Sequence, residues 1–201
     1  MTINNDNQTT KYLLTKAFPS VLSSDVKIVI NCLSDTNRQP EGKIGKITLF
    51  NEPLSIPFRI AYPEPDVSII STLNLTQQVI LSCLYTRYIK GLVREKHLLK
   101  IITVNEIWVL PFIFALAAED VKEIIVTIYN NRESINKDQA QIFNQENSEY
   151  MRLTRHRIIS FWDLYFRVEW PLLKDYPGYR IMSELGLWNS HDGRRLLRPL
   201  K

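Results

Sequence analysis

The sequence has few glycines, and they form no phosphate-binding loop. It contains six glycines in 201 residues, with neither G-x-G-x-x-G nor G-K-[ST] among them. Such loops let backbone N–H groups approach a phosphate, so the common nucleotide-binding motifs are excluded. Enzymes also assemble sites from scattered residues, and an enzyme of unrecognised type therefore stays an alternative. A deep pocket that combines His97 or His156 with Glu119 would favour it.

Cysteine and histidine are also scarce, which argues against a metal site. Cys32 and Cys83 both lie among apolar residues, so we expect buried, reduced thiols. The three histidines (His97, His156 and His191) belong to no H-x-x-x-H, E-x-x-H or C-x-x-C arrangement. Closely spaced ligands of that kind are typical of metal sites. The sequence therefore predicts no metal, no cofactor and no catalytic residue, and it favours a protein that is not an enzyme.

Long hydrophobic runs are missing as well. The longest candidate, residues 107–118, is shorter than the roughly 18 residues that a membrane-spanning helix needs. The N-terminus is polar and rich in asparagine, without the basic and apolar regions of a signal peptide. These absences predict a cytoplasmic protein without a membrane span, and the high Ile, Asn and Lys content indicates an AT-rich, bacterial genome.

The length and composition fit one globular domain, because 45% of the residues are hydrophobic and 23% are charged. We expect residues 1–10 to be disordered and residues 11–201 to form a single domain. Its parts are a β-containing section (11–66), a helical body (67–171) and a basic C-terminal segment (172–201). The net charge of +4 arises near the C-terminus, because residues 152–201 hold ten Lys/Arg against five Asp/Glu.

Three segments near the N-terminus alternate apolar and polar residues, which is typical of half-buried strands. They span 26–32, 46–50 and 54–62, and residues 51–53 are expected to form a hairpin turn between the last two. Pro57 cannot donate a hydrogen bond to a neighbouring strand. We therefore expect the third strand to lie at a sheet edge or to contain a bulge.

Three longer segments are expected to be helices. The first and third repeat apolar residues at helical spacing, which is typical of amphipathic helices, and the second is apolar on most of its circumference, which is typical of a central helix. They span about 74–102, 108–131 and 137–170. Asn74 and Gln77 have the spacing of a capping pair, and Pro111 fits the first turn of the second helix. The predicted fold class is α+β and predominantly helical. A small antiparallel β-hairpin or sheet near the N-terminus packs on a bundle of about three long helices.

The first predicted helix carries a row of cations on one face. Arg87, Lys90 and Arg94, continued by His97, are separated by three or four residues and so lie within reach of one another. Such a row is a candidate docking surface for an acidic partner, with Trp108 as a candidate anchor. One alternative is that the row faces solvent or pairs internally with an acidic cluster on the second helix (Glu119, Asp120 and Glu123). For Trp108, the alternative is burial between the helices, which is favoured for a large aromatic.

A second basic set follows in the C-terminal part: Arg152, Arg155, His156, Arg194, Arg195 and Arg198, with Arg157 beside the first three. Aromatic residues are interleaved with it, and cations with aromatics can bind a nucleic acid. The favoured alternative is a core stripe, including Phe161, Tyr165 and Val168, with a solvated basic edge. No RNP or helix-turn-helix signature accompanies this set.

The function predicted from these patterns is that of a non-catalytic protein-interaction protein, such as an adaptor, an inhibitor or an immunity-type protein. It would use charge-segregated helical surfaces to bind another protein. Nucleic-acid binding through the basic C-terminal part is the first alternative, and an enzyme is the second. The apolar stripe of the third predicted helix is long enough to serve a homodimer.

Overall fold

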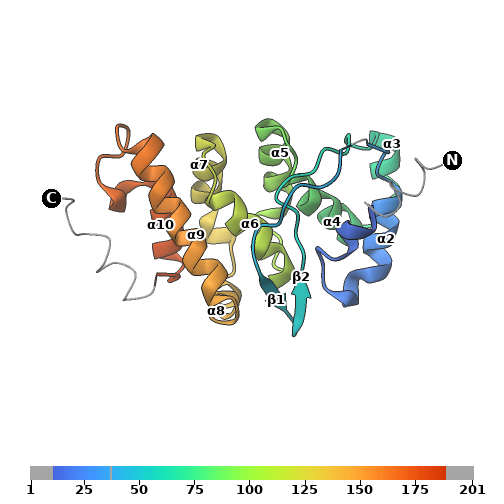
Figure 1. The fold of residues 1–201 in the computed structure, drawn as a ribbon, viewed down its shortest axis with the longest axis horizontal. Coiled ribbons are helices and arrows are strands. Elements are labelled where there is room, and N and C mark those ends of the chain that lie inside the picture. Colours follow the sequence, from blue (N-terminus) through green and yellow to red (C-terminus); the bar gives the residue numbers. More distant parts are fainter. Residues whose placement is uncertain (1–10, 37, 189–201) are drawn as a thin grey trace.

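The computed structural model describes residues 11–36 and 38–188, and it is predominantly helical (Figure 1). The expected disorder of residues 1–10 lies outside the described residues. After a helical segment at residues 11–15, the 3-10 helix η1 (Ser20–Leu22) leads into α2 (Ser23–Asn31).

The helix α2 replaces the strand that was expected over residues 26–32, so that prediction was wrong. Val26, Val29 and Ile30 are buried, and their spacing is that of one helix face. Ile28 belonged to the same face of the expected strand, but it is 46% exposed. The period-2 pattern was real but short, and a period near 3.6 fits the same residues.

The small antiparallel sheet is confirmed as a hairpin of β1 (Ile47–Leu49) and β2 (Glu52–Leu54). Phe50 and Asn51 connect the strands with φ angles of 52° and 62°, which is typical of a two-residue loop. The turn therefore begins before the expected residues 51–53. The chain leaves the ladder after Leu54 because the N–H of Ser55 bonds to the carbonyl of Lys16 (2.6 Å). The third strand is consequently much shorter than predicted.

The first long helix is divided into α4 (Leu75–Tyr85) and α5 (Gly91–Ile101), after the short helix α3 (Val67–Ile70). The predicted capping pair is confirmed: Asn74 and Gln77 form a reciprocal capping box at the start of α4. Between α4 and α5, the N–H of Ile60 bonds to the carbonyl of Arg87, and the N–H of Ile89 bonds to the carbonyl of Ile60. These bonds divert the backbone from the helical pattern and separate the two helices.

The second long helix is also divided. The 3-10 helix η2 (Ile107–Val109) leads into α6 (Leu110–Ala117), where Pro111 occupies the first turn as expected. The chain then turns through residues 118–121 before α7 (Lys122–Asn130) begins. This turn carries Glu119 to the inside of the molecule, where it is 5% exposed.

The third long helix is interrupted at Asn147, between α8 (Lys137–Glu146) and α9 (Ser148–Phe161). The Asn147 side chain accepts a hydrogen bond from the N–H of Thr48 (2.7 Å) and donates one to its carbonyl (3.0 Å). The remaining elements of this part are the 3-10 helices η3 (Arg132–Ser134) and η5 (Leu173–Asp175), the π-helix η4 (Trp162–Phe166) and α10 (Pro177–Glu184). A bundle of three long helices is therefore not confirmed, because each predicted helix is interrupted.

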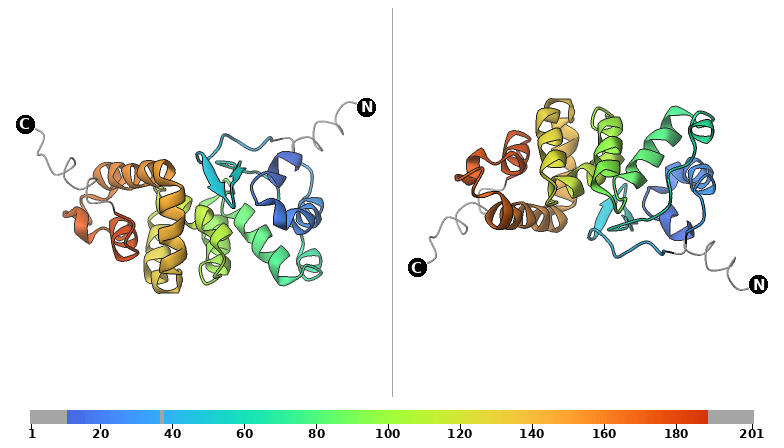
Figure 2. Two further views of the ribbon diagram at one scale, coloured as in Figure 1. Left: turned by 90° about the horizontal axis from the view of Figure 1, so that it is seen from below. Right: turned by 90° about the horizontal axis from the view of Figure 1, so that it is seen from above.

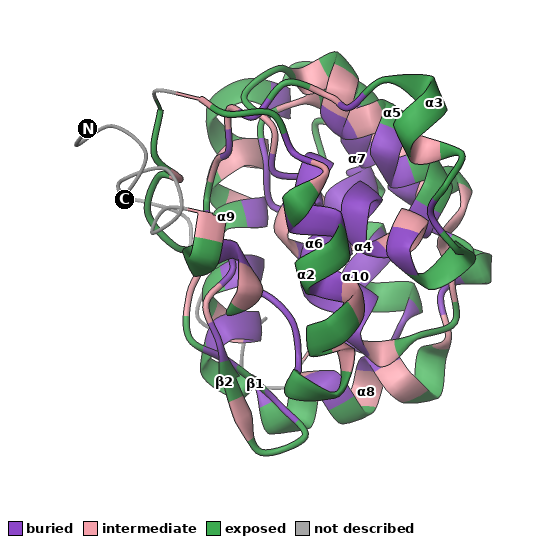
Figure 3. Ribbon diagram, turned by 90° about the vertical axis from the view of Figure 1, so that its right-hand side faces the viewer, coloured by how far each residue is buried: buried purple, intermediate pink, exposed green. Residues whose placement is uncertain are grey.

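The helices follow one another along the long axis of the molecule (Figure 1), with α5 packed on α7 and α7 packed on α10. The hairpin lies on one side of this row (Figure 2), where β1 also contacts α8. Buried residues gather on the inward faces of the helices (Figure 3). Among the described residues, no helix has the length and apolar character needed to cross a membrane.

Candidate functional site

Two of the predicted surface cations, Arg87 and Arg94, lie inside the protein. Arg87 is 1% exposed and Arg94 is 4% exposed. The break between α4 and α5 turns Arg87 inward, where its Nε and Nη2 atoms donate to the carbonyl of Phe58 (3.3 and 3.1 Å). A docking role for these two side chains does not fit this burial.

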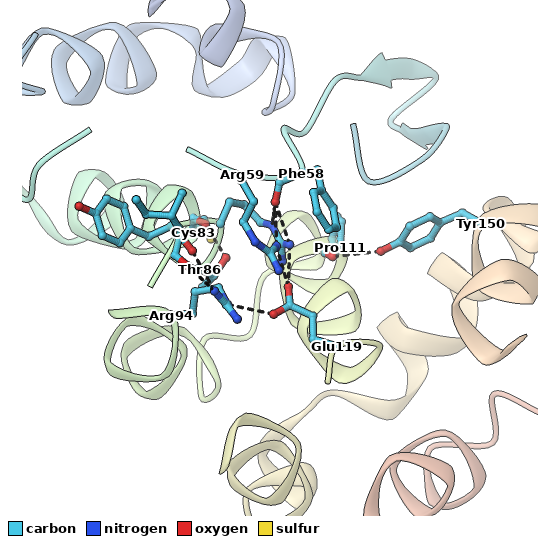
Figure 4. Close-up of polar contacts among 11 residues, drawn as sticks. Phe58, Arg59, Cys83, Thr86, Arg94, Pro111, Glu119 and Tyr150 are labelled. Carbon is cyan, nitrogen blue, oxygen red and sulfur yellow. Dashed lines mark hydrogen bonds and ion pairs between the residues drawn. The ribbon is translucent and has the colours of Figure 1, made fainter. Parts of the chain in front are cut away.

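Glu119 is the carboxylate that pairs with these arginines (Figure 4). Its Oε1 atom accepts hydrogen bonds from Arg87 Nη2 (2.7 Å) and from Arg59 Nη1 (3.0 Å), and its Oε2 atom lies 2.9 Å from Arg94 Nε. We call these four side chains the arginine cluster: Arg59, Arg87, Arg94 and Glu119. The internal pairing considered from the sequence is thus observed for Glu119, whereas Asp120 and Glu123 are exposed.

Burial lowers the pKa of both Arg87 and Arg94, and the charge of Glu119 opposes this shift. Both guanidinium groups stay protonated because their ordinary pKa lies far above neutral pH. The cluster therefore places three positive charges around one negative charge in a poorly solvated region. Such a charge excess is stabilised only while the carboxylate is in place.

His97 is also buried, but it belongs to a separate contact. Its Nε2 atom lies 2.8 Å from Glu64 Oε1, and its ring stacks on that of Tyr85 with a centroid distance of 5.0 Å. Burial lowers the pKa of His97 to about 4. At neutral pH the ring is therefore neutral, and Nε2 carries the proton that is donated to Glu64.

The two remaining residues of the predicted docking surface, Lys90 and Trp108, differ in their exposure to solvent. Lys90 is exposed, as a docking role requires. Trp108 is 5% exposed and packs against Phe18 with a ring-centroid distance of 6.0 Å. Burial, which was the favoured interpretation for Trp108, is thus observed. Of the five predicted partner-binding residues, only Lys90 keeps an exposed side chain.

A pocket of about 440 Å³ lies beside the arginine cluster. Its polar wall comes from Arg59, Arg87 and Glu119 of the cluster, together with Asp120 and Arg157. The apolar wall consists of Ile44, Phe58, Ala115, Ala118 and Phe161. Neither His97 nor His156 lines this pocket, so it lacks the combination that would favour an acid–base enzyme.

Only some side chains of the second basic set are exposed to solvent. Arg155 is fully buried and donates to Asn144 Oδ1 (2.9 Å) and to the carbonyl of Leu187 (3.0 Å). Arg152 is partly exposed and pairs with Glu149 (2.7 Å), and His156 is exposed. The other members, Arg194, Arg195 and Arg198, lie outside the described residues.

The end of α9 exposes apolar side chains that the sequence pattern placed in the core. Tyr165 is 60% exposed and Val168 is 96% exposed, so their assignment to a core stripe was wrong. The π-helix η4 lies here, and its wider turn shifts the helical register that the pattern assumed. We call the exposed apolar side chains of this region the α9-end surface: Leu164, Tyr165, Val168 and Leu172.

Comparisons with protein-family models, with curated proteins and with solved structures give no match. Within residues 11–36 and 38–188, no group of three or more His, Cys, Asp or Glu side chains is arranged to hold a metal ion. The interpretation of the site therefore rests on its own geometry.

Sequence reasoning missed Arg59, which lines the pocket, and it placed Arg157 in the second basic set rather than beside Arg87 and Glu119. Arg59 lay on the polar face of an expected strand, and that pattern predicts exposure rather than an ion pair. Its partner Glu119 is 60 residues away in the sequence. The one available signal was the acidic cluster itself, because buried cations need a carboxylate nearby.

Proposed function

We propose that the chain is a non-catalytic protein-interaction protein that docks on another protein through the α9-end surface. The observation that carries this proposal is the exposure of Leu164, Tyr165, Val168 and Leu172, which ranges from 54% to 96%. Exposed apolar patches rimmed by polar residues are typical of protein–protein interfaces.

The α9-end surface adds little to the stability of the isolated chain. Val168 is almost fully exposed, so it gains hardly any burial from folding. Burying a valine or leucine side chain stabilises by roughly 1.5–3 kcal/mol. A partner that covers Leu164, Val168 and Leu172 would therefore gain several such contributions, and Tyr165 adds an amphipathic ring of the kind enriched in interfaces.

Charges around this surface favour a protein partner over a nucleic acid. Arg167 pairs with Asp163, and Lys122 pairs with Glu169 (2.6 Å). These cations are already neutralised by carboxylates, so they offer a phosphate backbone little net attraction. An apolar centre with a balanced polar rim fits a protein that presents an apolar groove.

The test is a comparison of partner capture by wild type and by the double variant Leu164→Asp, Val168→Asp. Nuclease-treated lysate of the native host is passed over each immobilised protein, and the retained proteins are identified by mass spectrometry. We expect one stoichiometric protein on wild type that is lost on the double variant. The matched control is Leu75→Asp, Leu92→Asp, which places the same charges on two leucines that are 82% and 83% exposed elsewhere.

A partner that binds the double variant as well as the control would refute this placement of the interface. Sedimentation of purified wild type tests a second copy as the partner. A dimer that dissociates only in the double variant would identify the docking surface as a homodimer contact.

Nucleic-acid binding stays the second candidate because the aromatic Tyr165 and the basic side chains of His156 and Arg157 are all exposed on this part of the chain. Exposed aromatics can stack on bases. It predicts an affinity for mixed-sequence DNA or RNA that falls steeply between about 50 and 200 mM salt. A fluorescence titration with labelled single strands that detects no binding at low salt would remove this candidate.

A further inference from the structure

We propose that the pocket beside the arginine cluster binds a small organic anion that carries two negative charges next to an apolar or aromatic body. This ligand site uses none of the residues of the α9-end surface. Either proposal can therefore fail while the other holds.

The charged side chains around the pocket do not balance. Four guanidinium groups gather there: Arg59, Arg87 and Arg157 line the pocket, and Arg94 contacts Glu119 behind it. Two carboxylates face them, Glu119 and Asp120. The sum is an excess of two positive charges. Two of the four arginines, Arg87 and Arg94, are buried, and charges interact strongly where water is excluded. An anion with two negative charges would balance them.

Two arginines beside the pocket have hydrogen-bond donors that the fold does not use or leaves exposed to solvent. Arg87 borders the pocket and is 1% exposed, and its Nη1 group forms no hydrogen bond within the described part of the chain. A buried donor without a partner destabilises a protein, so such groups are usually satisfied. Arg157 lies on the exposed side of the same pocket. The planar guanidinium group is well suited to phosphate and carboxylate oxygens.

The size of the pocket and its apolar wall fit a small organic ligand better than an inorganic ion. A volume of about 440 Å³ lies within the range of small-molecule sites, which is about 300–1,000 Å³. Phe58 and Phe161 contribute aromatic rings, and Ile44, Ala115 and Ala118 complete the apolar wall. An inorganic ion would leave this wall uncovered. A ligand with a ring or an alkyl body beside its charged group would cover it and gain hydrophobic stabilisation.

Isothermal titration calorimetry at low ionic strength tests the proposal with three probes. Phenyl phosphate and phthalate both combine two negative charges with a ring, and inorganic phosphate carries the charge alone. We expect wild type to bind phenyl phosphate or phthalate more tightly than inorganic phosphate. Preference between the two aromatic probes tells whether a phosphate ester or a dicarboxylate is the natural ligand class.

The variant Arg157→Gln removes one cation from the exposed side of the pocket, where the fold does not depend on it. We expect its affinity for the better probe to fall at least about tenfold, because hydrogen bonds to charged groups are lost. Arg157→Lys keeps the charge and should retain part of the affinity. Arg180→Gln is the matched control, because Arg180 is a surface arginine of α10 that pairs with Glu184 and does not line the pocket.

Two results would overturn the proposal. One is the absence of heat from both aromatic probes with folded wild-type protein. The other is an equal loss of affinity in Arg157→Gln and Arg180→Gln, which would show non-specific attraction to a basic protein. Circular dichroism of each variant confirms that the helices are intact before the titration is interpreted.

Discussion

Among single residues, Glu119 has the largest expected effect on stability, because three arginines depend on its carboxylate. Glu119→Gln keeps the shape of the side chain but removes its charge, so the buried Arg87 and Arg94 lose the carboxylate that they contact. Breaking a buried ion pair in this way destabilises by about 3–5 kcal/mol. Urea denaturation followed by circular dichroism measures the loss as a lower midpoint.

The control for this prediction is Glu123→Gln, which makes the same chemical change at an exposed position of α7. Surface substitutions of this kind usually change stability by no more than about 0.5 kcal/mol. Equal midpoints for the two variants would contradict the role of Glu119 and would indicate that the arginines are well solvated.

Because His97 is buried, we expect the free energy of unfolding to depend on pH. Burial lowers its pKa to about 4 from the ordinary value of 6.5, while the hydrogen bond to Glu64 opposes the shift. Between these two values the unfolded chain binds a proton at His97 and the folded chain does not. The free energy of unfolding should therefore decrease as the pH falls from about 6.5 to about 4, by on the order of 3 kcal/mol. Urea denaturation at a series of pH values measures this slope.

The substitution His97→Gln isolates that effect, because its amide can still donate to Glu64 but does not titrate. We expect a flatter dependence between pH 6.5 and 4 for this variant. His156→Gln, at an exposed histidine of α9, should keep the wild-type slope. If His97→Gln and wild type lose stability in parallel, another group is responsible for the dependence.

At the scale of helices, two glycines should respond in opposite directions to alanine. A Cβ at Gly178 in α10 would lie 2.6 Å from the Cε1 atom of Tyr176, a buried ring. A Cβ at Gly91, the first residue of α5, would meet side-chain atoms only at 3.8 Å or more. Overpacking costs about 1–3 kcal/mol, which exceeds the helix propensity of about 1 kcal/mol that alanine adds.

Gly178→Ala should therefore lower the thermal midpoint, whereas Gly91→Ala should leave it unchanged or raise it slightly. Differential scanning calorimetry of the two variants measures both shifts. A stabilised Gly178→Ala would show that Tyr176 can move away without loss of packing.

The helical character of residues 74–161 was predictable from the sequence, but α2 and the places where the longer helices break were not. The capping pair of Asn74 and Gln77 and the position of Pro111 depend on neighbouring residues, and the structure confirms both. The breaks depend on distant partners instead: Ile60 pairs with the backbone around Arg87, and Thr48 pairs with Asn147. No local pattern contains those partners, so the segments looked like long, continuous helices.

The candidate site was also only partly predictable from the sequence: its charged residues were visible, but the pocket was not. The sequence supplied the opposite charges of Arg87, Arg94 and Glu119, and internal pairing was one of the interpretations it left open. Which interpretation holds depends on the helix breaks, because they turn Arg87 and Glu119 inward. Arg59 and Arg157 join them only through the tertiary fold, so the pocket had no signature in the sequence.

For the whole molecule, the contacts between distant segments predict a single cooperative unfolding transition. Asn147 connects the hairpin to α8 and α9 through two hydrogen bonds to Thr48, and Tyr150 donates to the carbonyl of Pro111 (3.3 Å). The tryptophans of the described chain lie on both sides of residue 136, with Trp108 before it and Trp162, Trp170 and Trp188 after it. Their fluorescence and the far-UV circular dichroism should therefore change at the same urea concentration.

Asn147→Ala tests the same connection, because it leaves the N–H and the carbonyl of Thr48 without their side-chain partner. A hydrogen bond contributes about 0.5–1.5 kcal/mol to stability, and two are lost, so we expect a lower midpoint. The midpoints measured by fluorescence and by circular dichroism should decrease by the same amount, because the contact between α7 and α10 still holds the C-terminal helices on the rest of the protein. Two separate transitions in wild type would contradict this interpretation. They would show that the helices after residue 136 fold as a unit of their own, and that the arginine cluster stabilises only the part before it.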